Sequence, residues 1–256
     1  MNLCRLTFGF LFTYAVLTCY SMVLAVLKSP QPFPLTPIST LLAFCFSILH
    51  AVQREGVRRA ILLAVLVFLT GLIFESIGVA TGLVYGPYHY TDQLGLKFLG
   101  LVPFLIPLAW MMMMYPSLVI ADSLIPRELS QGVRWLAVAA LGGVVMTAWD
   151  VAMDPMMVFS GNWVWDVKGA FFGVPLQNYW GWWLTTFITL GLYLVGARWL
   201  KDRPRGISNQ WAVWAYLFTT LSTVLVDLAL GLEGPALAGL FAVVPWIIVG
   251  FVCKAK

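Results

Sequence analysis

Residues 98–122 read FLGLVPFLIPLAWMMMMYPSLVIAD, a run with no charged side chain before its last residue, Asp122. An apolar run of about 20 residues is long enough to cross the hydrocarbon core of a bilayer as one helix. The run at residues 56–82, GVRRAILLAVLVFLTGLIFESIGVATG, is also long and apolar, with charges only at Arg58, Arg59 and Glu75. Together these runs indicate a protein built from membrane-spanning helices.

The composition of the whole chain agrees with this interpretation. Hydrophobic residues make up 61% of the sequence and charged residues 10%, whereas about 25% of the residues in soluble domains are charged. At about 20 residues per span, a chain of 256 residues has room for eight spans and for no additional soluble domain. We therefore expect an all-α, polytopic helical bundle that forms a single transmembrane domain, residues 1–256.

The apolar runs predict eight helices, at residues 6–27, 36–53, 59–80, 98–122, 133–153, 177–200, 209–230 and 236–253. The second is the weakest, because it is short and follows the proline-rich segment SPQPFPLTP, which resists helix formation. The first predicted helix follows the basic residue Arg5, an arrangement that also occurs in signal peptides. Its apolar run is longer than the usual ~7–15 residues and no clear A-x-A site follows it, so we expect a first span.

The basic residues give this topology an orientation. With eight spans, one side of the membrane holds twelve of the fifteen Lys and Arg residues, namely Arg5, Arg54, Arg58, Arg59, Arg127, Arg134, Arg198, Lys201, Arg203, Arg205, Lys254 and Lys256. Loops rich in Lys and Arg stay in the cytoplasm. We therefore expect both termini to be cytoplasmic and the protein to be a multi-pass protein of the inner (plasma) membrane.

The acidic residues gather on the opposite side. Between two apolar runs, residues 83–97 read LVYGPYHYTDQLGLK, and the eight-span topology brings this loop close to six of the eleven acids, Glu75, Asp92, Asp150, Asp154, Asp166 and Asp227. An ionisable side chain at bilayer depth costs about 2.5 kcal/mol or more, so such residues are candidates for a functional site.

The loop after the fifth predicted helix has the same mixed character. Asp150 and Asp154 are four residues apart and share a helix face, which we expect Pro155 to interrupt. Aromatic residues and the amide of Asn178 follow, which suggests a mostly apolar pocket with a few polar groups. The run Met111–Met114 could add an adaptable apolar wall for a long, rigid ligand, although we expect most of these methionines to face lipid or the core.

Carboxyl groups and aromatic rings together suit the chemistry of carbocations. A carboxyl group in an apolar pocket keeps its proton and can act as a general acid, and ring faces stabilise a cation. Metal chemistry is not expected, because the four cysteines are scattered and the two histidines, His50 and His89, fall on opposite sides. We expect His89 to bond a neighbouring acid.

Several motifs together carry a resemblance to a known family. They are GLVYGPYHYTDQLG, VPFLIPLAWMMMMYPS, AWDVAMDPMMV with GNWVWD, and FFGVPLQNYWGWW. In order and spacing, over roughly residues 70–185, they resemble the membrane-bound carotenoid biosynthesis family. Its characterised members are carotenoid 1,2-hydratases of the γ-carotene 1',2'-hydratase and bisanhydrobacterioruberin hydratase types.

The resemblance implies that water adds across the terminal C1=C2 double bond of an acyclic carotenoid end, of the γ-carotene or lycopene type, without redox change and without a cofactor. The expected partners are this polyene, water and the lipid bilayer, with no nucleic acid. Asp150 or Glu75 is the expected proton donor. The candidates for holding water are Asp92, Asp154 and Asn178, and those for lining the substrate site are Tyr88, His89, Tyr90, Trp110 and Asp166.

Three other functions fit parts of the pattern. A carotenoid cyclase would begin with the same protonation, and an internal alkene would then capture the cation. A membrane prenyltransferase could use Asp150 and Asp154 to hold Mg²⁺ and a diphosphate, although only Lys97 and Lys168 lie near to neutralise it. A proton-coupled transporter could relay protons through the acids, but it would more naturally show inverted repeats.

Overall fold

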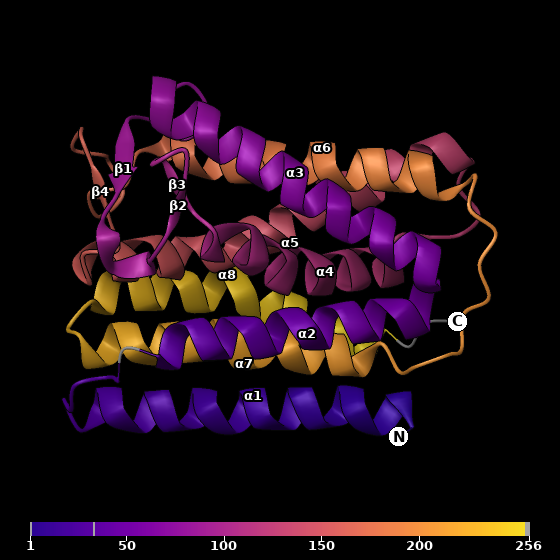
Figure 1. The fold of residues 1–256 in the computed structure, drawn as a ribbon, viewed down its shortest axis with the longest axis horizontal. Coiled ribbons are helices and arrows are strands. Elements are labelled where there is room, and N and C mark those ends of the chain that lie inside the picture. The colour runs from indigo at the N-terminus through magenta and orange to yellow at the C-terminus, as the bar shows by residue number, and fades with distance from the viewer. Residues whose placement is uncertain (1, 33, 254–256) are drawn as a thin grey trace.

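A computed structural model describes residues 2–32 and 34–253 as a bundle of long helices (Figure 1). The described residues form eight α-helices: α1 (Leu3–Val26), α2 (Leu35–Glu55), α3 (Val57–Thr81), α4 (Leu105–Leu124), α5 (Gln131–Phe159), α6 (Leu176–Ala197), α7 (Gln210–Ala229) and α8 (Glu233–Val252). Each helix corresponds to one of the eight apolar runs. The prediction of a helical membrane bundle is confirmed.

Seven of these helices, all except α6, are long and apolar enough to cross a membrane. The polar residues of α6 include Gln177 and Asn178 in its first turn and Thr185, Thr186 and Thr189 further along. It nevertheless packs against α3 and α5 within the bundle. The eight-span topology therefore stays a prediction, while the eight helices themselves are observed.

Helices α4 and α5 form the centre of the bundle. Helix α4 contacts α2, α3, α5, α7 and α8, and α5 contacts α4, α6, α7 and α8. All four residues of the run Met111–Met114 are buried in α4, so they lie in the core and do not face lipid. Because α3 and α5 pack against α4, and α6 packs against α3 and α5, polar residues near one end of these helices can meet in the bundle interior.

The fourth helix begins at Leu105 and not at residue 98 as predicted. Residues 97–103 instead form a hairpin of β2 (Lys97–Phe98) and β3 (Val102–Pro103). Its turn places Leu99 and Gly100 in the left-handed region, with φ of 51° and 71°, which a right-handed helix cannot include. Hydropathy could not reveal this boundary, because the hairpin residues are themselves mostly apolar.

The fifth helix does not end at Pro155 as expected but continues to Phe159. Proline removes one backbone hydrogen bond, and close packing of neighbouring helices allows it to persist within membrane helices. Here α8 approaches α5 closely, since a Cβ atom added to Gly239 would lie 2.4 Å from Cβ of Ala152. The extra turns carry α5 to the loops at this end of the bundle.

Those two polar loops meet in a small sheet. Strand β1 (Tyr88–Tyr90) pairs antiparallel with β4 (Trp163–Trp165), so that Tyr88 faces Trp165 and Tyr90 faces Trp163. Both strands lie at the left end of the bundle in Figure 1. Successive side chains of a strand point to opposite faces, and accordingly Tyr88 and Tyr90 are buried whereas His89 is exposed. A short 3₁₀ helix, η1 (Asp92–Leu94), follows β1.

The opposite end of the bundle gathers basic residues. Arg54 and Arg134 both pair with Asp122, and Arg59 donates to the Leu200 carbonyl oxygen. Helix α1 begins and α8 ends at this same end (Figure 1). Lys254 and Lys256 lie outside the described residues. That this end faces the cytoplasm stays a prediction.

Candidate active site

Glu75, near the end of α3, is held by three hydrogen-bond donors. Its Oε2 atom accepts from the hydroxyl groups of Tyr88 and of Tyr90, the latter at 2.8 Å. Its Oε1 atom accepts from Nε1 of Trp110 in α4 at 3.0 Å. Only 3% of the Glu75 surface is exposed. Donors to a carboxylate favour its charged form, so this cradle can hold a buried negative charge.

The two tyrosines are suited to this role because they remain protonated. Burial, and next the charge of Glu75, raises the pKa of the Tyr88 phenol well above its usual value of 10. The same two causes raise the pKa of Tyr90. Both hydroxyl groups therefore stay hydrogen-bond donors throughout the physiological pH range.

A second cluster joins α5 and α6. Nδ2 of Asn178 donates to Oδ2 of Asp150 at 2.6 Å and to Oδ2 of Asp154 at 2.7 Å. All three side chains are buried. One amide therefore bridges two carboxyl groups that stand one helical turn apart, as the four-residue spacing predicted.

The two aspartates have unequal surroundings. Oδ1 of Asp154 also accepts from the indole Nε1 atoms of Trp163 and Trp165, at 2.9 and 3.1 Å. Oδ1 of Asp150 is buried and has no hydrogen-bond partner among the described residues. Three donors thus stabilise a charge on Asp154, and only one stabilises a charge on Asp150.

The two clusters face a common cavity of about 170 Å³. Glu75, Asp154 and Asn178 line it, whereas Asp150 does not. Eight aromatic residues also line it: Tyr85, Tyr88, Tyr90, Trp110, Trp149, Trp163, Trp165 and Trp182. The rings of Trp110 and Trp182 stack with centroids 4.4 Å apart. Met112 is the one residue of the four-methionine run in this lining.

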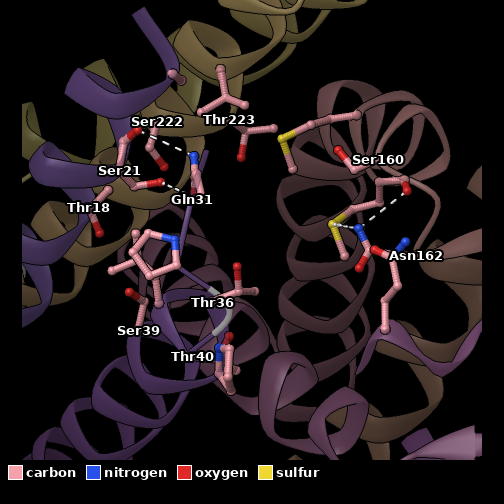
Figure 2. A pocket seen from close by; sticks show the side chains of 18 of the residues that line it. Thr18, Ser21, Gln31, Thr36, Ser39, Thr40, Ser160, Asn162, Ser222 and Thr223 are labelled. Atoms are coloured by element: carbon pink, nitrogen blue, oxygen red, sulfur yellow. Dashed lines mark hydrogen bonds between the residues drawn. The ribbon is translucent and has the colours of Figure 1, made fainter. Parts of the chain in front are cut away.

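A larger cavity of about 1430 Å³ adjoins the first. It lies between α1, α2, α5 and α7, and hydroxyl and amide side chains surround it (Figure 2). The lining residues that both cavities share include Thr40, Met112 and Thr223. Water or a polar group in the larger cavity can therefore approach the carboxyl groups of the smaller one.

Three predicted site residues lie outside the smaller cavity, although Asp92 lines the larger one. The Asp92 side chain is fully exposed and pairs with Lys97 at 2.8 Å, and this hydrogen bond lowers the Asp92 pKa. His89 does bond a neighbouring acid, Asp166, at 2.9 Å, on the outer face of the β1–β4 sheet. Neither pair lines the smaller cavity. The structure thus brings together seven of the ten candidates: Glu75, Tyr88, Tyr90, Trp110, Asp150, Asp154 and Asn178.

Some site residues were not singled out from the sequence. Trp163 and Trp165 stood among many aromatic residues, and their alternation in WVW was the signal that both point to one face. Tyr85 is buried and shares a hydrogen bond of 2.9 Å with Thr185. Asp227, grouped with the site acids by topology, is buried in α7 and does not line the cavity.

Among residues 2–32 and 34–253, no three His, Cys, Asp or Glu side chains are grouped to hold a metal ion. The donors that meet the carboxyl groups are instead phenol, indole and amide groups. Such a site can hold charge and move protons within an apolar cavity.

Comparisons with known proteins point to one family. A family model described as "Carotenoid biosynthesis protein" matches residues 35–245. The bisanhydrobacterioruberin hydratase of Haloarcula japonica is 34% identical over 154 residues, which cover 57% of this chain and 51% of that protein. The chain thus matches about half the length of this relative. No solved structure matches the chain.

Proposed function

This chain belongs to the carotenoid biosynthesis protein family, and we propose that it adds water to the terminal C1=C2 double bond of an acyclic carotenoid end. The product is a tertiary alcohol. The proposal depends above all on the aromatic cavity that two buried carboxyl groups, Glu75 and Asp154, enter from different helices. The name of the archaeal relative supports the same reaction class.

Asp154 is the proposed proton donor. Two carboxyl groups that share one buried amide repel each other when both are charged, so the pair of Asp150 and Asp154 retains a proton. Asp154 is the member that lines the cavity. At rest the shared proton lies on Asp150, which has one donor, and it must pass to Asp154 before it can be donated to a ligand in the cavity. The three donors of Asp154 then stabilise the carboxylate that remains after donation. Asp150, one of the two proton donors expected from the sequence, then supplies the proton to Asp154 and does not protonate the substrate directly.

The aromatic rings are the proposed stabilisers of the cation. Protonation at C2 of the alkene leaves a tertiary cation at C1, and the faces of Trp and Tyr rings attract positive charge. Trp110 and Trp182 stack, and Trp149 meets Trp182 edge-on at 5.9 Å, so these three rings hold one another in place. A fixed arrangement of rings needs little reorganisation when the charge develops.

Glu75 is the proposed acceptor of the second proton. Its Oε1 atom has a single donor, Trp110, and so keeps a lone pair for a water molecule. Water that adds to C1 would release a proton to this carboxylate. One proton leaves Asp154, one reaches Glu75, and the substrate gains the elements of water. Proton exchange with solvent restores both groups.

The prenyltransferase alternative is less compatible with this geometry. A cation held by Asp150 and Asp154 would need the oxygen atoms that the Asn178 amide now contacts. The cyclase alternative shares the first step, and the two reactions differ in whether water reaches C1. The adjoining cavity with its hydroxyl groups favours water.

Pigment analysis of a bacterium that produces lycopene or γ-carotene and expresses this chain tests the proposal. We expect a product 18 mass units heavier that silylates as a tertiary alcohol. Asp154→Asn and Glu75→Gln should abolish it. Glu233→Gln makes the same chemical change as Glu75→Gln at an exposed position, and should leave the yield unchanged.

Other results of that experiment are equally informative. A product of unchanged mass with a shortened chromophore would replace the hydratase proposal with cyclase activity. Unchanged pigments with both substrates, although the protein is present in membranes, would overturn the proposal for those substrates. Hydration by both variants would remove Asp154 and Glu75 from the mechanism.

A further inference from the structure

A cavity of about 510 Å³ lies at the basic end of the bundle, far along the helices from the carboxyl groups described above. Side chains from α2, α3, α4, α5 and α6 and from the α4–α5 loop line it. Five of the lining residues are arginines: Arg54, Arg59, Arg127, Arg134 and Arg198. The acids in the lining are Glu55 and Asp122. Five positive against two negative side chains leave an excess of three positive charges.

The two acids form ion pairs with only two of the five arginines. Asp122 accepts from Arg54 at 2.6 Å and from Arg134 at 2.5 Å, and Glu55 also accepts from Arg54. Arg59 donates to a backbone carbonyl oxygen, that of Leu200, at 3.2 Å. The guanidinium group of Arg198 lies 4.2 Å from the ring centroid of Trp199. Arg59 and Arg198 are therefore fixed in place by neutral groups, and their charge remains available.

Two buried polar atoms in the lining have no partner among the described residues. They are the hydroxyl oxygen of Tyr193 in α6, which lies near the Glu55 carboxylate without a hydrogen bond of normal length to it, and Nε of Arg134 in α5. Tyr193 is only 2% exposed. Both groups can donate hydrogen bonds, and buried donors are normally satisfied. An acceptor that carries negative charge would satisfy both of them and balance the excess arginine charge.

We propose that this cavity binds a phosphate group, and that the phosphate belongs to the head group of an anionic membrane lipid. Arginine binds phosphate through paired N–H donors, and basic pockets between helices at the cytoplasmic side of membranes hold such head groups. Trp135, which lines the cavity, and Trp199 flank Arg198, and tryptophans of this kind mark a membrane surface.

The positive-inside rule alone explains the arginines of this cavity less well than a bound anion does. Arginines that only keep a loop in the cytoplasm need no partner and remain in water, as the exposed Arg203 and Arg205 of the α6–α7 loop do. In the cavity lining, Arg54 and Arg134 instead have side chains that are only 15% and 18% exposed, while Arg127 and Arg198 are exposed. The inference is independent of the reaction proposed above.

The test uses the purified full chain in a neutral detergent. Phosphatidylglycerol, phosphatidylcholine and inorganic phosphate are titrated separately, and the thermal unfolding midpoint gives an apparent Kd for each, since a ligand of the native state raises that midpoint. We expect phosphatidylglycerol to raise the midpoint, and phosphatidylcholine to have no such effect. The alternative result is that inorganic phosphate raises the midpoint in the native chain and loses this effect in the arginine variants described below. That result would identify a soluble phosphate compound as the ligand.

The double variant Arg127→Gln, Arg198→Gln should weaken phosphatidylglycerol binding about thirtyfold, at about 1 kcal/mol for each arginine near an anionic lipid. Its matched control, Arg203→Gln with Arg205→Gln, removes the same charge from the exposed loop at this end and should bind almost as the native chain does. Equal weakening by both pairs, or equal binding of the two lipids, would overturn the proposal. Tyr193→Phe provides a second test if the double variant does not fold, and should weaken binding several-fold.

Discussion

Tyr88 and Trp165 face each other across the β1–β4 sheet, with ring centroids 5.0 Å apart, yet their polar atoms serve different acids. The Tyr88 hydroxyl group donates to Glu75, whereas the Trp165 indole donates to Asp154. One strand pair therefore fixes two carboxyl groups that belong to α3 and α5. The first predictions concern these donors.

Tyr90→Phe should lower the rate of product formation about 10- to 100-fold while the protein remains folded. The substitution removes one hydrogen bond of 2.8 Å to the Glu75 carboxylate, and a bond to a charged group contributes about 1.5–3 kcal/mol. Conversion of carotenoid by isolated membranes measures the effect. Tyr20→Phe makes the same change at an exposed position of α1 and should be neutral. A native rate for Tyr90→Phe would mean that Glu75 needs no such donor.

Asn178→Ala should reduce both the stability and the activity of the protein. Among the described residues, it removes the one donor to Asp150 and one of three donors to Asp154, and leaves two buried carboxyl groups without the amide between them. Loss of a buried partner costs about 1–3 kcal/mol, and more where charge is involved. Thermal unfolding in detergent and the membrane assay measure the two effects. Gln210→Ala, at an exposed amide of α7, serves as the control.

Gly181→Ala should destabilise the protein by about 1–3 kcal/mol, the cost of overpacking a core. A Cβ atom at Gly181 would lie 2.5 Å from the Tyr85 ring and 2.7 Å from the Val84 carbonyl oxygen. Gly191→Ala in the same helix is the matched control, because nothing lies within 4 Å of the Cβ atom it adds. The two variants are compared by their thermal unfolding midpoints. Equal midpoints would show that Tyr85 can move aside at little cost.

Thr40→Val should lower the yield of hydrated product, whereas Thr40→Ser should retain it. The side chain of Thr40 lines both cavities, and its hydroxyl group is well placed to pass water between them. Valine has nearly the same shape and cannot form a hydrogen bond. Pigment analysis gives the ratio of hydrated product to unreacted substrate and isomers. An identical ratio for Val and Ser would exclude this hydroxyl group from the supply of water.

The helices and the deepest site residues could be predicted from the sequence for simple reasons. Long apolar runs can form little else in a bilayer, because every backbone polar group must be satisfied within the chain. Acids inside such runs, such as Glu75 and Asp150, cannot face lipid cheaply. They therefore had to gather in the interior, together with a partner such as Asn178.

The loops could not be predicted in the same way. His89 was placed in the site because it stands between Tyr88 and Tyr90, but pairing with β4 turns it to the outer face, where it meets Asp166. Composition does not reveal that pairing, which joins segments far apart in the chain. Asp92, a candidate for holding water, pairs with Lys97 at the surface and lines the larger cavity, so its role stays a prediction.

The β1–β4 sheet also constrains how a ligand can arrive. Displacement of β1 from the bundle would take the tyrosine hydroxyl groups from Glu75, and displacement of β4 would take the indoles from Asp154. This end of the bundle cannot then be both open and ready to react. If the ligand is the rigid polyene proposed above, we expect it to enter sideways between helices while the β1–β4 sheet stays in place and keeps the donors on both acids.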